Sequence, residues 1–383
     1  MINMWAHIMK LTSGLFSRFY ITVMIPFQST HIPTDKLTTD MDELGRELSE
    51  KMKEYYSIEE TEHLQRISKV YRVADKDKTY IIRYSFNVDV LLKIYFFEGD
   101  YESDDIIKQI GDTRKDAIKA SNELIFQEKT KELAERSAYI ALFAENPDES
   151  IRIKKFVDDH QNEILHILLL EETAWVLNIE TLVRTGLLRN HSFYADSCVF
   201  ISDYIFVQIT DKQTPLIDRM MWSVCSILNE SAYRHLLRSL FLRLRYNISE
   251  KKAPISLLKI KIDVLKSLYE FSLTQDFVYV GALHLRSEIR KLWKIKKLED
   301  DVQEAINQLG SLVVEREALV SRTMIMILTV ASAIGSVIAV VEFLTGGFFA
   351  ALIVLLSVVL LIALLFVMVP WILRKFSLKE LFE

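Results

Sequence analysis

The strongest pattern in the chain is a pair of long apolar runs near its C-terminus. Residues 323–341 (TMIMILTVASAIGSVIAVV) and 348–373 (FFAALIVLLSVVLLIALLFVMVPWIL) are each long enough to cross a bilayer as a helix, which takes about 20 residues. Between Thr323 and Leu373 the only formal charge is Glu342. Since a helix satisfies its own backbone in lipid, the pattern predicts two transmembrane helices. The alternative is a buried hairpin in a soluble core, which such paired runs disfavour.

Basic residues flanking these runs predict their orientation. Arg316 and Arg322 precede the first run, and the tail at 374–383 begins with Arg-Lys. The connecting segment at 342–347 contains no Lys or Arg. Because cytoplasmic flanks carry the excess of Lys and Arg, we expect both ends in the cytoplasm and the loop outside.

Small residues recur along the first run. Ala331, Gly335 and Ala339 are spaced by four, a pattern that lets helices approach closely. We expect an inner ring of first helices around a pore and an outer ring of second helices. The alternative is that this stripe only packs the hairpin against itself. The residues expected to line the pore are Ser332, Gly335, Ser336, Ala339, Glu342 and Thr345.

A long amphipathic segment leads into the first run. Residues 277–322 contain no proline, and their apolar positions recur with a coiled-coil period. The seam consists of Val302, Ile306, Leu309, Val313 and Val320. The pattern predicts one stalk helix continuous with the first span, packed on its own domain or on identical subunits. Arg316 fills the skipped seam position, and a water-filled stalk pore would hydrate it.

Two basic clusters are candidate anion sites. One lies on the stalk, where Arg290–Lys297 is followed by an acidic block beginning at Glu299. Paired charges on a solvated helix explain such a switch, and an anionic ligand with divalent cations is the alternative. The other cluster comprises Arg234, His235, Arg238, Arg243 and Arg245. Arg forks match phosphates, although such a run is more often a polar face or pairs with neighbouring acids. The residues chosen as candidate ligand contacts are Arg234, Arg238, Lys294 and Lys297.

The residues before the stalk alternate between strand and helix patterns. Single strands are expected at 19–27, 88–100 and 137–146, and pairs of strands within 68–86 and within 196–211. Helices are expected at 39–56, 104–136 and 149–189. Two further helices are expected to begin at Pro215 and after Pro254. The predicted organisation is an α+β cytosolic domain (1–212), a helical region with the stalk (213–322), two transmembrane helices (323–373) with an outer loop (342–347), and a cytosolic tail (374–383).

Composition excludes several classes of function. The net charge of −5 argues against nucleic-acid binding, and two cysteines without metal-ligand spacing, Cys198 and Cys225, indicate reduced thiols. No phosphate-binding glycine loop, zinc-protease or serine-hydrolase motif occurs. Glu-x-x-His pairs at 60–63 and 163–166 match a di-iron spacing, but chance explains them. We therefore expect no enzyme and no tightly bound cofactor; a nucleotide or divalent cation could be the ligand.

The order of these elements resembles the CorA-type divalent-cation channels, above all in residues 280–376, where LVSRTMIMILTVASAIGSVIAVVEFLTGG is similar to the family's first span and its exit. The resemblance implies a funnel-shaped homopentamer with first spans lining the pore. The family's Gly-Met-Asn signature is absent, and EFLTGG (342–347) occupies its place. CorA-like proteins without that signature include membrane effectors of prokaryotic anti-phage systems, among them type III CRISPR systems that make nucleotide messengers.

Three functions follow as hypotheses. The first is a plasma-membrane effector that a small anionic nucleotide opens. The second is a divalent-cation channel in which Glu342 forms a carboxylate ring. The third is a membrane-tethered binding protein without a pore.

Overall fold

The chain forms two compact units. A computed structural model describes residues 14–29, 36–55, 68–124, 138–147, 151–170, 189–211, 215–250, 254–272, 280–345, 352–353 and 356–357. The sheet unit comprises Met1–Ser239 and Ser267–Glu299, and the helical unit comprises Leu240–Lys266 and Asp300–Glu383. This division differs from the boundary expected after residue 212, because the first part of the following helix packs on the sheet.

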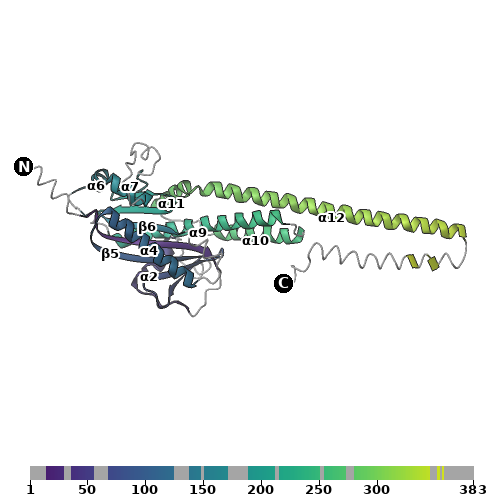
Figure 1. Ribbon diagram of the computed structural model, residues 1–383, viewed down its shortest axis with the longest axis horizontal. Coiled ribbons are helices and arrows are strands. Elements are labelled where there is room, and N and C mark those ends of the chain that lie inside the picture. The colour runs from purple at the N-terminus through teal and green to yellow at the C-terminus, as the bar shows by residue number, and fades with distance from the viewer. Residues whose placement is uncertain are drawn as a thin grey trace, which may run out of the picture. The chain divides into compact units, whose positions relative to one another are not determined.

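A mixed sheet forms the centre of the sheet unit (Figure 1). Within the described residues it has eight strands in the order β2-β3-β4-β5-β1-β6-β8-β7. Their bounds are β1 Phe16–Gln28, β2 Leu37–Thr38, β3 Ser68–Val73, β4 Thr79–Tyr84, β5 Val88–Tyr101, β6 Tyr139–Glu145, β7 Ser197–Ile201 and β8 Ile205–Thr210. All neighbours are antiparallel except β6 and β8, which are parallel. Apart from the short β2, the strands confirm the sequence prediction.

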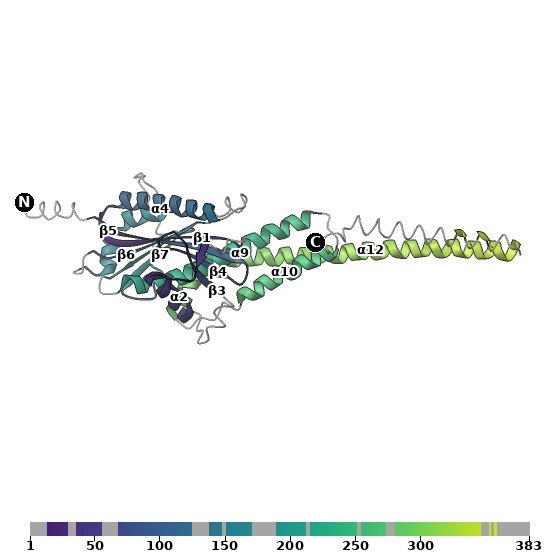
Figure 2. The same cartoon turned by 90° about the horizontal axis from the view of Figure 1, so that it is seen from below.

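Helices cover both faces of this sheet. Their bounds are α2 Glu43–Tyr55, α4 Ser103–Leu124, α6 Ile153–Asp159, α7 Gln161–Leu169, α9 Leu216–Ser249, α10 Pro254–Ser272, α11 Val280–Leu292 and α12 Ile295–Thr345. Figure 2 shows α4 along one face, with α2 and α9 on the other side. The α+β prediction for the N-terminal part is therefore confirmed. The expected helical residues 125–136, 149–150 and 171–188 lie outside the described ranges.

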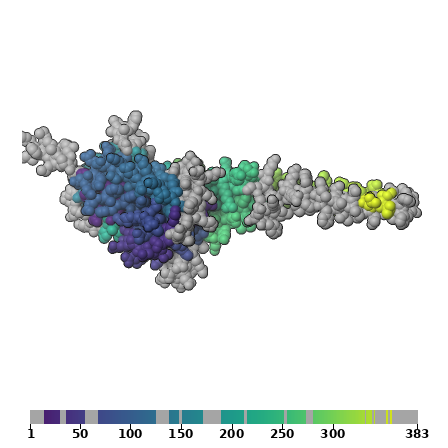
Figure 3. Space-filling view, turned by 60° about the horizontal axis from the view of Figure 1, so that its bottom comes forward, coloured from purple at the N-terminus to yellow at the C-terminus, as the bar shows by residue number. Residues whose placement is uncertain are grey.

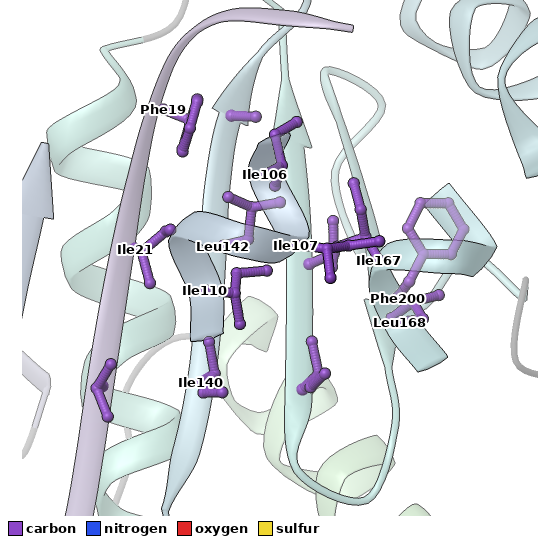
Figure 4. Packing of buried hydrophobic residues seen from close by; sticks show 14 of the residues in the cluster. Phe19, Ile21, Ile106, Ile107, Ile110, Ile140, Leu142, Ile167, Leu168 and Phe200 are labelled. Atoms are coloured by element: carbon purple, nitrogen blue, oxygen red, sulfur yellow. The ribbon is translucent and has the colours of Figure 1, made fainter. Parts of the chain in front are cut away.

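The main hydrophobic core lies under α4. Figure 4 shows Ile106, Ile107 and Ile110 of α4 over Ile21 of β1 and Leu142 of β6. All five side chains are at most 4% exposed. Burial of each such side chain contributes about 1.5–3 kcal/mol. Because β1 is covered on both faces, its residues are almost continuously apolar.

The start of α2 differs from the prediction. The sequence predicted a helix over 39–56, but Leu37–Thr38 pairs as β2 and the helix begins at Glu43. Asp42 is the capping residue, because its Oδ1 accepts a hydrogen bond from the Gly45 N–H at 2.8 Å.

The predicted continuous helix over 277–322 is interrupted. α11 ends at Leu292, and α12 begins at Ile295 after Lys294, whose φ of 53° is left-handed. No glycine or proline marks this break in the sequence. The indole of Trp293 is 1% exposed and its Nε1–H donates to the Ser202 carbonyl at 2.9 Å. Anchoring of Trp293 on the β7–β8 turn thus interrupts the helix.

The helical unit is held together by α9, α10 and α12. Arg243 on α9 pairs with Asp263 on α10 at 3.3 Å. Lys261 on α10 lies close to Gly310 on α12. The guanidinium of Arg316 donates to the Glu250 carbonyl just after α9, at 3.0 Å. The predicted seam of α12 is buried from Val302 to Leu309 and half-buried beyond it, so this chain's own helices partner it.

α12 is a single helix from Ile295 to Thr345, as predicted from the stalk into the first apolar run. It contains one segment long and apolar enough to cross a membrane, whose 18-residue window has a mean hydropathy of 1.7 and no buried residues. This segment is consistent with membrane association. The second apolar run lies outside the described residues, except for exposed helical positions such as Leu352 and Leu356.

Candidate functional site

A cavity of about 180 Å³ opens in the sheet unit. The segment from His191 to Ser197, strands β7 and β8, and the first turns of α9 and α11 line it. For comparison, a cavity of about 150 Å³ holds a benzene molecule. The cavity can therefore accept a single planar ring.

One wall of the cavity carries a histidine that is oriented by a carboxylate. The His191 side chain is 3% exposed, and its Nδ1 lies 2.7 Å from Oε2 of Glu288 on α11. Burial lowers the pKa of His191, and Glu288 only partly opposes this effect. The neutral ring donates its Nδ1–H to the carboxylate, which leaves Nε2 as an acceptor. Nε2 has no hydrogen-bond partner among the described residues.

Aromatic rings form the sides of the same cavity. Trp222 of α9 and Tyr194 line it, and Tyr194 is 43% exposed. A β-carbon at Gly281 would lie 2.4 Å from the Tyr194 hydroxyl oxygen, so only glycine leaves the tyrosine in place. Such rings stack with planar ligands.

The remaining lining mixes apolar side chains, such as Leu285, with polar ones, and its charges are paired: the lining carboxylate of Asp218 lies 2.8 Å from Lys51. Ser223 donates its hydroxyl to Gln208 Oε1 at 2.6 Å. Arg219, the one Arg or Lys among the described lining residues, stacks 4.3 Å over Tyr194 and pairs with Asp196 at 2.8 Å. The cavity therefore favours an uncharged heteroaromatic group, whose polar edge could donate to His191 Nε2.

The basic residues chosen from the sequence do not line this cavity. Arg234 is only 5% exposed, and it donates to the Asp203 carbonyl at 3.0 Å. Its guanidinium packs on the rings of Tyr139, Tyr204 and Trp293. Arg234 also lies 3.4 Å from the Asp203 carboxylate, so it pairs with a neighbouring acid, as the alternative to the anion-site interpretation expects.

The other candidate residues, from both basic clusters, differ in their burial. His235 is buried, and burial lowers its pKa to about 4, so it is neutral at pH 7. Arg238 is half-buried. Lys294 and Lys297 are exposed at the start of α12. None of these residues lines the cavity described above.

A buried ion network was not foreseen from the sequence. Glu230 of α9 is fully buried and pairs with Arg286 and Arg290 of α11. Arg290 also pairs with Glu299 of α12, which accepts from the Tyr233 hydroxyl at 2.8 Å. Two features of the sequence could have indicated this network. They are a lone glutamate within the apolar part of α9 and two arginines four residues apart on α11. The network ties three helices together at the base of α12.

The predicted pore residues occupy the apolar part of α12. Ser332, Gly335 and Ser336 are exposed in this single chain, and the Ser336 hydroxyl donates to the Ser332 carbonyl at 2.9 Å. α12 continues through Glu342 to Thr345, so the expected start of the outer loop at 342 is too early. The side chains of Ala339, Glu342 and Thr345 lie outside the described set. The Arg316 guanidinium donates a hydrogen bond to the Glu250 carbonyl, just after the end of α9. This bond accommodates a charged residue at the seam position, so hydration by a pore is not needed to explain it.

Metal-binding arrangements are absent from the described part of the chain. No group of three or more His, Cys, Asp or Glu side chains there could hold an ion. Glu163 instead lies 3.7 Å from His160. The pair at 60–63 lies outside the described residues.

No family model, curated protein or solved structure matches the chain.

Proposed function

We propose that this protein is a homo-oligomeric membrane channel that a small ligand opens from the cytoplasmic side. The observation that carries the proposal is α12, a single helix from the buried ion network at Glu299 to the apolar, unburied segment. Such a helix connects its base to the apolar segment through one continuous backbone. Its exposed small residues, including Gly335, suit close packing of identical helices.

α11 supplies a route from ligand to helix. Its first turns line the cavity through Gly281 and Leu285, and Glu288 holds His191. Its far end carries Arg290 and continues through Trp293 into α12. A ligand in the cavity biases the channel only if it binds the open form more tightly than the closed form.

The resemblance to CorA-type channels adds the rest of the proposal. It suggests a pentamer with first spans inside, and a nucleotide messenger whose binding permeabilises the plasma membrane in anti-phage defence. A base would enter the cavity, and its phosphates would remain outside, because the lining offers no unpaired cation among the described residues.

The test is dye and ion release from liposomes that contain the purified chain. A panel of linear and cyclic mono-, di- and oligonucleotides should include at least one that increases release. Trp222→Ala should abolish this response, because it removes a cavity wall. Arg245→Ala, on the same helix but outside the cavity, should respond normally. Equal release with and without every nucleotide contradicts ligand gating.

A divalent-cation channel is the second candidate, favoured by Glu342 in the last turn of α12. A ring of carboxylates at a pore mouth attracts cations. Glu342→Gln should then reduce the selectivity for Mg²⁺ over Cl⁻ in the same liposomes, measured as a reversal potential. Unchanged selectivity removes the case for this ring.

A further inference from the structure

One side of the cavity is formed by the sheet itself. Gln208 of β8 is paired directly opposite Val199 of β7. On the other side of β7, the backbone N–H of His191 donates to the Val199 carbonyl at 2.8 Å, so His191 continues the sheet beyond its edge strand. All three side chains line the cavity. They therefore form one row across it, with the apolar Val199 between two polar side chains.

This row lies on the face of the sheet that α4 does not cover. The next residues along the two strands, Phe200 and Val207, belong to the core under α4, and successive side chains of a strand point to opposite faces. The blue surface in Figure 3 belongs to the part of the chain that includes α4. Residues of α9 and α11 line the rest of the cavity. A planar ring can therefore lie between these helices and the row.

The two ends of the row have opposite hydrogen-bonding capacities. His191 donates its Nδ1–H to Glu288, so its buried Nε2 is an acceptor without a partner among the described residues. Gln208 is 4% exposed, and its side chain makes one hydrogen bond to a described side chain, which Ser223 donates to its Oε1. The amide nitrogen of Gln208 is thus a donor that no described residue accepts.

The spacing of the row suits one ring. Neighbouring strands lie about 5 Å apart, which places the Cα atoms of His191 and Gln208 about 10 Å apart, on either side of Val199. Buried polar groups without partners are rare in folded proteins because they cost free energy. A ligand that satisfies both groups at once would recover this free energy.

We propose that the cavity binds an uncharged heteroaromatic ring that lies over Val199. The ring directs an N–H to His191 Nε2 and, from its opposite side, an acceptor to the Gln208 amide. It needs no phosphate, because Asp218 and Arg219, the charged residues among the described lining, are paired with Lys51 and Asp196. The inference deepens the proposed function, and it rests on that function only in taking this ring as the part of the gating ligand that enters the cavity.

The experiment compares two probes of the same shape. γ-Pyridone carries an N–H and, across the ring, a carbonyl oxygen, whereas γ-pyrone has an ether oxygen in place of the N–H. Binding to the purified chain in detergent is titrated by saturation-transfer NMR, with protein-free micelles as the blank. γ-Pyridone should bind at least tenfold more tightly, because γ-pyrone leaves His191 Nε2 unpaired. Equal dissociation constants for the two probes overturn the proposal, and this comparison needs no variant to fold.

Variants assign the two ends of the ring. His191→Phe should remove the preference for γ-pyridone. Gln208→Leu should weaken both probes by a similar factor and keep the preference, because both carry the carbonyl. Arg245→Ala, outside the cavity, is the matched control and should bind both probes as the native chain does. A preference for γ-pyridone that persists in His191→Phe, with its fold verified by circular dichroism, also overturns the proposal.

The outcomes for the ring and for the channel are separate, because binding is scored without liposomes. A chain that prefers γ-pyridone but never leaks in response to a nucleotide contradicts the channel and leaves the ring site intact. A chain that leaks in response to a nucleotide but binds both probes equally contradicts the ring site alone.

Discussion

Replacing Arg286 by methionine should lower the free energy of unfolding by about 3–5 kcal/mol, the usual effect of removing one partner of a buried ion pair. The Glu230 side chain is fully buried, and Arg286, itself 7% exposed, is its nearer cation. Without Arg286 the carboxylate keeps Arg290, at 4.0 Å, and a hydrogen bond from the neutral Asn229 amide, at 3.3 Å, to offset its desolvation. The measurement is thermal or denaturant unfolding of the detergent-solubilised chain, followed by tryptophan fluorescence.

The pH dependence of this loss has a definite sign. Burial already raises the pKa of Glu230, and its arginines lower it. Removing Arg286 raises this folded-state pKa further, so the carboxyl becomes protonated at a higher pH. The deficit of the variant should therefore be larger at pH 8 than at pH 5.5.

A double variant provides the control. Glu230→Leu with Arg286→Met replaces the charges with apolar groups of similar size and should recover most of the lost stability. If the free energy of unfolding of Arg286→Met lies within about 0.5 kcal/mol of the native value, Glu230 and Arg286 do not form the buried ion pair described above.

Replacing Trp293 by alanine should lower the free energy of unfolding by about 3–5 kcal/mol and uncouple ligand binding from channel opening. The indole is buried, packs 4.6 Å from the ring of Tyr139 and donates to Ser202. It is therefore the anchor that fixes where α12 begins. The measurements are the melting temperature and nucleotide-triggered dye release.

Trp293→Phe separates the two roles of this side chain. It keeps an aromatic ring against Tyr139 and loses only the hydrogen bond to Ser202, which is worth about 1 kcal/mol. We expect near-normal release from this variant. If Trp293→Ala released dye in response to nucleotide at the native level, the junction between α11 and α12 would not be the element that couples binding to opening.

Local patterns were enough to predict most elements of the sheet unit. The polar turn at 75–78 and the alternation around it predicted the β3–β4 pair, and continuous apolar runs predicted the buried β1 and β6. The long helix α12 followed from its period and from the absence of proline. These features depend on residues that are neighbours in the sequence.

Tertiary contacts explain the errors. The break at Lys294 depends on the docking of Trp293 on a turn some 90 residues earlier, which no local pattern encodes. The partner of Arg234 could not be named from the sequence because its acceptor, Asp203, lies on that same turn. The cavity was missed for the same reason, since its walls come from separate segments such as the one holding Tyr194 and the one holding Gly281.

The length of α12 has a mechanical consequence. Its 51 residues extend about 77 Å at about 1.5 Å per residue. If α12 turns as a rigid rod about Ile295, a tilt of about 5° displaces Thr345 by about 7 Å. This displacement exceeds the diameter of about 4.6 Å on which the Cα atoms of a helix lie. Under the proposed function, a small rearrangement around α11 would be enough for ligand binding to move the apolar end of α12 by that distance.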